Sequence, residues 1–468
     1  MKEQNKLGIF TLAMINVAAV LSLRNLPPLA EYGYTLIFYL TLSCICFFIP
    51  SALVSAELAS GWPKKGGVYL WVKEAFGPGL GVVAIFMQWI ENLPWFPAAL
   101  AFAAAALAYI FNPALAANKL FVISVIWISL WGATFLNFRG MRLSAFLSSS
   151  GVISGTIIPG VVIIVLGVIY VVSGKPLAIA FSPGSLIPKL GNLNQFMLLA
   201  GMMMAISGME MSAVHVTEVE NPKKNFPRAI FIACMIIIFL SVMGSLSISV
   251  VIPVKNLSLS AGVCQAFEDL FKTHGMGWVT PIISFLLAYG AFAMVITWMA
   301  GPSKGVREVA KEGYLPKFMQ KENKYGMPTG TLIVQAVIST ILSLAVLFMP
   351  TVSGAFWIMS ALAAQLYLVM YLLMFAAAIK LRYSQPEVER PYKIPGGKAG
   401  MWIVSGVAFL TSLFVIIFGF IPTETVRKAG TAAMTAYVAF LLVGLIIFIA
   451  VPVLFYHRAK RRVIYETQ

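Results

Sequence analysis

Long apolar runs dominate the sequence and are separated by short polar segments. Each run is long enough to cross the hydrocarbon core of a bilayer, about 30 Å, as a helix. The pattern predicts an all-α, polytopic membrane protein with twelve transmembrane helices. The expected spans are residues 8–33, 35–58, 79–111, 119–137, 145–173, 194–216, 226–253, 279–305, 331–350, 353–381, 400–422 and 431–456.

Two of these runs, the first and the sixth, are interrupted at mid-depth. The first contains Ser22–Pro28, with a break expected near Pro27 and Pro28, and the sixth contains Ser207–Glu210. A glutamate in hydrocarbon costs roughly 2.5–3.5 kcal/mol on insertion scales, so it normally faces protein or water. Glycine beside it makes a helix break less costly, which frees backbone groups to hold a ligand. The alternative is a kinked helix whose polar groups are satisfied.

The two interrupted runs are five spans apart, so the two halves of the chain have opposite topology. Interrupted helices at matching places in inverted halves are typical of a secondary transporter and mark its binding site. Nothing in the sequence resembles a Gly-x-x-x-x-Gly-Lys-Ser/Thr nucleotide loop, so we expect gradient-driven transport without a cofactor. The histidines His215, His274 and His457 are far apart and acids are scarce, so neither a catalytic cluster nor a metal site is predicted.

Composition and charge agree with a membrane protein. The chain has 468 residues, of which 60% are hydrophobic and 11% charged, and its mean hydropathy is +0.89. Its net charge of +16 does not suggest nucleic acid as a partner, because the basic residues lie in short loops beside the spans. With the N-terminus inside, 25 Lys and Arg residues fall on the inner side and seven on the outer side. This imbalance predicts that both termini are cytoplasmic.

Four loop strings, in chain order, carry a resemblance to a known family. They are Glu57–Val72 after the second span, His215–Ala229 after the sixth, Gly301–Gly305 with Glu312–Pro316 after the eighth, and Arg390–Lys398 after the tenth. They resemble the cytoplasmic signatures of the amino acid–polyamine–organocation transporters. The resemblance covers essentially the whole chain, and Gly301–Gly305, Leu259–Val263 and Ala213–Val216 are closer to the bacterial glutamate/GABA antiporter branch.

The resemblance implies a fold and an activity. The fold would be a LeuT-type five-plus-five inverted repeat, with residues 1–173 and 194–381 as the repeats. Two C-terminal helices within 400–456 and a short basic cytoplasmic tail, 457–468, would follow. The activity would be exchange of amino acids, or of an amino acid for its decarboxylated amine product. Together with the lack of a targeting peptide, the resemblance indicates the bacterial inner membrane. No oligomeric state is predicted.

An amino acid substrate is a zwitterion whose two charges must both lose water. Backbone N–H groups at a broken helix end can bind the carboxylate, and freed carbonyls can bind the ammonium. We expect these backbone groups at Val20, Leu21 and Ser22 in the first span. In the sixth span we expect them between Ala205 and Gly208, which includes Ser207.

Three charged residues are predicted within the spans. Glu210 matches the sixth-span glutamate of the family, where it acts in proton sensing or gating; the alternative is a glutamate that only braces helices. Arg24 needs a carboxylate partner or water. Glu91 is the first candidate partner and Glu210 the second, and Arg24 can also contact an acidic side chain of the substrate. Glutamate/GABA relatives carry an aromatic residue at the position of Arg24. Proton coupling or gating is therefore assigned to Glu210 and Glu91.

The remaining candidates come from the resemblance and helical spacing. Asn92 matches an asparagine that contacts ligand in arginine/agmatine antiporters, and Trp298 matches a tryptophan that walls their cavity; core packing is the alternative for Trp298. Tyr367 and Tyr371, four residues apart, share one helix face and match a tyrosine pair of the glutamate/GABA branch, unless they face lipid. Met204 stands where arginine-handling relatives carry tryptophan.

We therefore predict a secondary active amino acid transporter working by alternating access. The preferred form is an antiporter for glutamate/GABA-like or neutral amino acids, and the alternative is a proton-coupled symporter. A channel or a membrane-embedded enzyme is the alternative of a different class.

Overall fold

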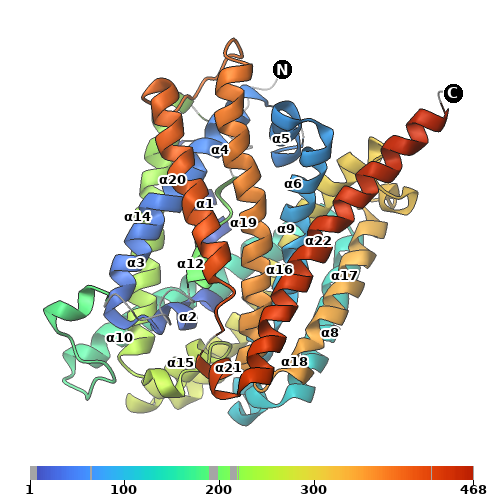
Figure 1. The fold of residues 1–468 in the computed structure, drawn as a ribbon. Coiled ribbons are helices and arrows are strands. Elements are labelled where there is room, and N and C mark those ends of the chain that lie inside the picture. Colours follow the sequence, from blue (N-terminus) through green and yellow to red (C-terminus); the bar gives the residue numbers. More distant parts are fainter. Residues whose placement is uncertain are drawn as a thin grey trace.

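The computed structural model describes residues 8–63, 66–188, 199–210, 219, 221–422 and 424–466. All elements in this part of the chain are helices, and they stand side by side in one bundle (Figure 1). Ten helical stretches of the described residues are long and apolar enough to cross a membrane, and they coincide with ten of the predicted spans. The all-α, polytopic prediction is confirmed, and the other two predicted spans are the interrupted ones.

The first predicted span is broken at Leu21 and Ser22, where freed backbone groups are expected, and not at the proline pair. Helix α1 (Ile9–Val20) ends where Leu21 and Ser22 adopt extended backbone, with ψ angles of 123° and 128°. A short turn, η1 (Leu23–Asn25), then leads into α2 (Leu26–Ala30). The proline pair occupies the start of α2 rather than the break, because proline needs no N–H partner in the first turn of a helix.

The sixth predicted span is interrupted where the sequence indicates. Helix α12 (Leu199–Ala205) is followed by a turn and by non-helical Ser207 and Gly208, before helical backbone returns at Met209 and Glu210. Gly208 has a φ of +117°, a conformation that only glycine adopts without strain. The rest of this span and the start of the His215–Ala229 string, together residues 211–218, lie outside the described residues, as does residue 194, where the second predicted repeat begins.

The other helices follow the predicted spans and loops. The longer elements are α3 (Leu36–Ser43), α4 (Ile49–Gly61), α5 (Val68–Phe76), α6 (Pro78–Ile90), α7 (Asn92–Phe111), α8 (Lys119–Phe138), α9 (Met141–Val152), α10 (Ile158–Val172), α14 (Pro222–Ser249), α15 (Gly262–Thr273), α16 (Thr280–Lys311), α17 (Thr329–Ser343), α19 (Val352–Ser384), α20 (Gly397–Phe418) and α22 (Thr431–Glu466). The short elements are α18 (Ala345–Phe348), α21 (Glu424–Lys428), η2 (Gly33–Thr35), η4 (Pro113–Ala117), η6 (Pro183–Leu186), η8 (Val254–Asn256), η9 (Gly277–Val279) and η10 (Lys317–Gln320). Two wide π-helical turns, η3 (Cys44–Phe48) and η5 (Ile153–Ile157), join α3 to α4 and α9 to α10.

The helices divide into a buried centre and a periphery. Helices α6 and α7 form the stretch Pro78–Phe111, and 89% of its most apolar 18-residue segment is buried. The corresponding share for Thr431–Lys460 in α22 is 11%. Helix α7 packs mainly on α16 and α19, whereas α22 runs obliquely along the outside of the bundle (Figure 1). Helix α22 continues to Glu466, so the described part of the predicted tail, 457–466, is helical.

Close packing of small residues places α16 beside the fifth predicted span. A Cβ atom on Gly155 in η5 would lie 2.4 Å from the Cα of Gly290 and 2.5 Å from the carbonyl oxygen of Leu286. Small residues let helix backbones approach this closely, and such contacts stabilise helix pairs in membranes. The contact holds the segment of α16 that precedes the cavity-lining residues Met294 and Trp298.

The ends of the chain agree with an even number of crossings. In Figure 1 the start of the described chain and the end of α22 lie toward the same end of the bundle as α5, while α15 and α21 lie at the opposite end. This is the alternation that the distribution of basic loops predicts. The division into two inverted repeats stays a prediction.

Candidate functional site

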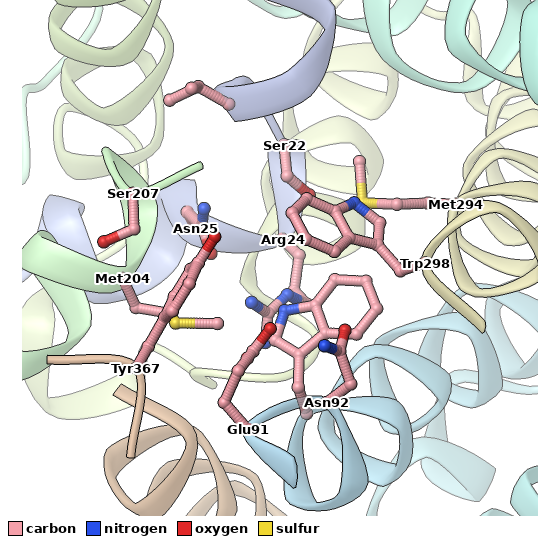
Figure 2. A pocket seen from close by; sticks show the side chains of 12 residues that line it. Ser22, Arg24, Asn25, Glu91, Asn92, Met204, Ser207, Met294, Trp298 and Tyr367 are labelled. Atoms are coloured by element: carbon pink, nitrogen blue, oxygen red, sulfur yellow. The ribbon is translucent and has the colours of Figure 1, made fainter. Parts of the chain in front are cut away.

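A small cavity of about 30 Å³ lies where the two interrupted segments meet the centre of the bundle. Its walls come from the break after α1, from α12 and its break, from the junction of α6 and α7, and from α16 and α19 (Figure 2). Nine residues predicted from the sequence line it: Val20, Ser22, Arg24, Glu91, Asn92, Met204, Ser207, Trp298 and Tyr367. The structure thus brings together residues from five separate predicted spans.

The junction of α6 and α7 follows from the local sequence. Pro94 has no N–H to donate to the carbonyl of Ile90, four residues earlier, so the helix hydrogen bonding is interrupted there. Glu91 sits at the turn between the two helices, and Asn92 begins α7. Both side chains point into the cavity (Figure 2).

Arg24 projects from the short turn η1 into the middle of the cavity (Figure 2). It is 4% exposed, and its guanidinium lies over the rings of Trp95 and Phe356, 5.3 and 5.6 Å from their centroids. Its Nη1 donates to the hydroxyl of Ser360 at 3.4 Å, and its Nε has no hydrogen-bond partner among the described residues. Aromatic faces stabilise a cation that has lost water.

The predicted direct pairing of Arg24 with Glu91 is not formed. No ion pair joins Arg24 to Glu91 or to Glu210, all three of which are described. Glu91 is 1% exposed and lines the same cavity, and its Oε2 has no hydrogen-bond partner within the described chain. Asn92 donates to the carbonyl of Gln88 at 3.0 Å and leaves its Oδ1 unpartnered in the same part of the structure. The cavity therefore contains a cation, a carboxyl group and an amide oxygen with unused bonding capacity.

Glu210 lies behind the cavity wall in a hydrogen-bonded cluster. The hydroxyls of Tyr367 and Tyr371 donate to its two carboxylate oxygens, and Nε2 of Gln88 donates to Oε1 at 3.1 Å. The N–H of Gly208, freed by the helix break, donates to the Tyr371 hydroxyl at 2.9 Å. The hydrogen bonds of Gly208 and Glu210 with Tyr371 thus connect the second break to α19.

Five predicted residues do not line this cavity: Leu21, Ala205, Gly208, Tyr371 and Glu210. Leu21 instead lines a separate apolar cavity between α1, α10 and α14. Ala205 is buried at the end of α12. The N–H of Gly208 is already bonded to Tyr371 and is not open to a ligand in this conformation.

Three lining residues, Asn25, Trp95 and Met294, are not among the predicted ones. Helical spacing could have indicated two of them, because Trp95 follows Glu91 by four residues and Met294 precedes Trp298 by four. The rings of Trp95 and Trp298 lie 6.1 Å apart and close one side of the cavity. No group of three or more His, Cys, Asp or Glu residues that could hold a metal occurs in the described chain.

Comparison with known proteins agrees with this architecture. Residues 7–455 match the family described as amino acid permease. An uncharacterized transporter of Legionella pneumophila is 41% identical over 449 residues, 96% of each chain. A glutamate/gamma-aminobutyrate antiporter of Lactococcus lactis is 32% identical over 98% of this chain and 92% of its own. A probable agmatine/putrescine antiporter of the same species is 25% identical over 96% and 94%. The chain therefore belongs to the amino acid permease family of multi-pass membrane transporters.

Proposed function

We propose that the protein is an amino acid antiporter that works by alternating access around the cavity at the two helix breaks. The observation that supports this most is the position of both breaks on one cavity that also holds Arg24, Glu91 and Asn92. Interrupted helices around a mid-bundle cavity suit a small zwitterion, because backbone and side chains can replace water at both of its charges. The glutamate/GABA antiporter among the relatives supports exchange of such amino acids.

The proposed roles follow the geometry. Val20, Ser22, Asn92, Met204, Ser207, Trp298 and Tyr367 surround the substrate. Glu210 acts in gating, because its bonds to Tyr367 and Tyr371 link the second break to α19. A rearrangement that opens the cavity must change these bonds or move their residues together.

The proposed location is the bacterial inner membrane with both termini in the cytoplasm. The distribution of 25 basic residues on one side and seven on the other supports this orientation. Relatives from Legionella and Lactococcus support a bacterial membrane.

Counterflow in proteoliposomes tests the proposal. Purified protein is reconstituted with a panel of unlabelled amino acids inside, and uptake of the labelled compound is followed from outside. We expect internal substrate to accelerate uptake, with glutamate, GABA and glutamine as the first compounds tested. Uptake that needs only a proton gradient would instead indicate a symporter, and passive flux without acceleration would indicate a channel.

A further inference from the structure

The cavity contains one buried cation and one buried carboxyl group that face the same space without pairing. Arg24 is 4% exposed and Glu91 is 1% exposed. The Nε of Arg24 and the Oε2 of Glu91 have no hydrogen-bond partner among the described residues, and both side chains point to the centre of the cavity (Figure 2). Buried charges without close partners are costly, so both groups are suited to bind something that enters the cavity.

The surroundings of Glu91 make it the group that can accept or release a proton there. The charged and titratable groups facing it are Arg24 from η1, Glu210 after the second break and Tyr367 from α19. Glu210 already accepts hydrogen bonds on both oxygens, and the Tyr367 hydroxyl donates one of them. From α16 only Met294 and Trp298 line the cavity, and neither titrates.

We infer that Arg24 and Glu91 together set the charge of the amino acid that the cavity accepts, with Glu91 protonated only when the substrate carries a second carboxylate. The inference rests on the proposed function and deepens it. When Glu91 is ionised, the two side chains sum to zero and suit a zwitterion of no net charge. When Glu91 is protonated, Arg24 is left as a net positive charge and suits an amino acid with an acidic side chain.

This charge rule, in which Glu91 is protonated only with an acidic substrate, has a defined consequence for transport. An acidic amino acid enters with one proton on Glu91, and both leave the site on the other side of the membrane. A zwitterion then returns with Glu91 ionised and the site carrying no proton. One exchange cycle therefore moves one proton and no net charge, because the negative charge of the acidic amino acid accompanies the proton.

The test compares L-glutamate with L-glutamine, which have nearly the same shape and differ by one unit of charge at pH 7. The full-length protein is kept in weakly buffered detergent solution, and proton uptake on binding is followed with a pH-sensitive dye. We expect the number of protons taken up per bound glutamate to exceed the number per bound glutamine by one. Equal proton uptake for the two amino acids, or binding of neither by the folded protein, would overturn the inference.

Three variants separate charge selection from a loss of folding. Glu91→Gln should abolish the difference in proton uptake and favour glutamate. Arg24→Gln should lower the preference for glutamate over glutamine by about 10- to 100-fold, as expected for a hydrogen bond to a charged group, whereas Arg24→Lys should retain it. Lys272→Gln, on the exposed surface of α15, is the matched control and should keep both the preference and the proton difference.

Failure of this rule differs from failure of the proposed function. If no amino acid accelerates counterflow, the antiporter proposal fails and the rule fails with it. If counterflow occurs and glutamate brings no additional proton, only the charge rule is wrong. An unchanged glutamate preference in folded Arg24→Gln would also contradict the rule while leaving antiport intact.

Discussion

Replacing Glu57 should destabilise the protein more than removing an ordinary ion pair. Glu57, at the end of α4, is 1% exposed and accepts hydrogen bonds from Nε and Nη2 of Arg382 at 2.5 Å each. The N–H of Ile394 donates to the same carboxylate at 2.8 Å, and Nε of Arg390 lies 3.7 Å away. One carboxylate therefore joins α4, α19 and the loop that leads to α20.

The expected cost follows from what Glu57→Gln leaves behind. The variant keeps the size of the side chain but leaves Arg382, 9% exposed, without its counter-charge, and Arg390 remains beside it. Removing one partner of a buried pair costs about 3–5 kcal/mol, mainly because the other charge stays buried. We expect a loss of this size in the free energy of unfolding.

The assay is unfolding of the purified protein in mixed micelles by SDS titration. Glu268→Gln is the matched control, because Glu268 pairs with Lys272 on the same helix and the lysine side chain is 64% exposed. Such a surface pair contributes at most about 0.5 kcal/mol. The double variant Glu57→Gln with Arg382→Met should cost less than the sum of the single variants, because it removes the uncompensated charge. A loss below about 1 kcal/mol for Glu57→Gln would refute the reasoning, since the pair would then behave like an exposed one.

Three further predictions concern the second break and the helix packing. Tyr371→Phe removes the acceptor of the Gly208 N–H and a donor to Glu210, so it should cost about 1–3 kcal/mol in the free energy of unfolding and slow counterflow. The control Tyr437→Phe, which loses a 3.2 Å hydrogen bond from α22 to the carbonyl of Gly419, directly after α20, should leave counterflow and binding unchanged. Equal loss of transport in both variants would argue against a gating role. Glu210→Gln should slow exchange but leave the proton difference between glutamate and glutamine at one; loss of that difference would transfer proton coupling from Glu91 to Glu210. Gly155→Ala should lower the free energy of unfolding by about 1–3 kcal/mol in SDS titration, because the new methyl group meets backbone atoms of α16. The control Gly132→Ala, with open space around it, should be neutral or stabilising by up to about 1 kcal/mol. Similar losses in both variants would show that the contact with Gly290 is unimportant.

Much of the fold could be predicted because apolar runs of spanning length have few alternatives to helix in a membrane. The break in the sixth span was also visible, since Ser207, Gly208 and Glu210 stand together in an apolar run. In the first span, Pro27 and Pro28 indicate a break a few residues too late, whereas the expectation of freed backbone groups at Val20, Leu21 and Ser22 agrees with the extended conformation of Leu21 and Ser22. A proline pair at the start of a helix is structurally unremarkable.

The site was predicted as a set of residues more successfully than as a set of contacts. Glu210 and Tyr371 are hydrogen-bonded although they are 161 positions apart in the chain. A single sequence does not reveal a contact between residues so far apart. The expected ion pair of Arg24 with Glu91 failed for a similar reason. Aromatic rings and Ser360 surround the guanidinium, and no local pattern near Arg24 specifies them.

Hydrogen–deuterium exchange tests most directly whether both breaks hold the substrate. Exchange of backbone amides is followed by mass spectrometry in the reconstituted protein, with and without the amino acid that gives the strongest counterflow. We expect substrate to slow exchange in peptides covering residues 20–25 and 204–210 together, while peptides from the outer helix α22 stay unchanged. Protection at neither break, with substrate demonstrably bound, would contradict the account.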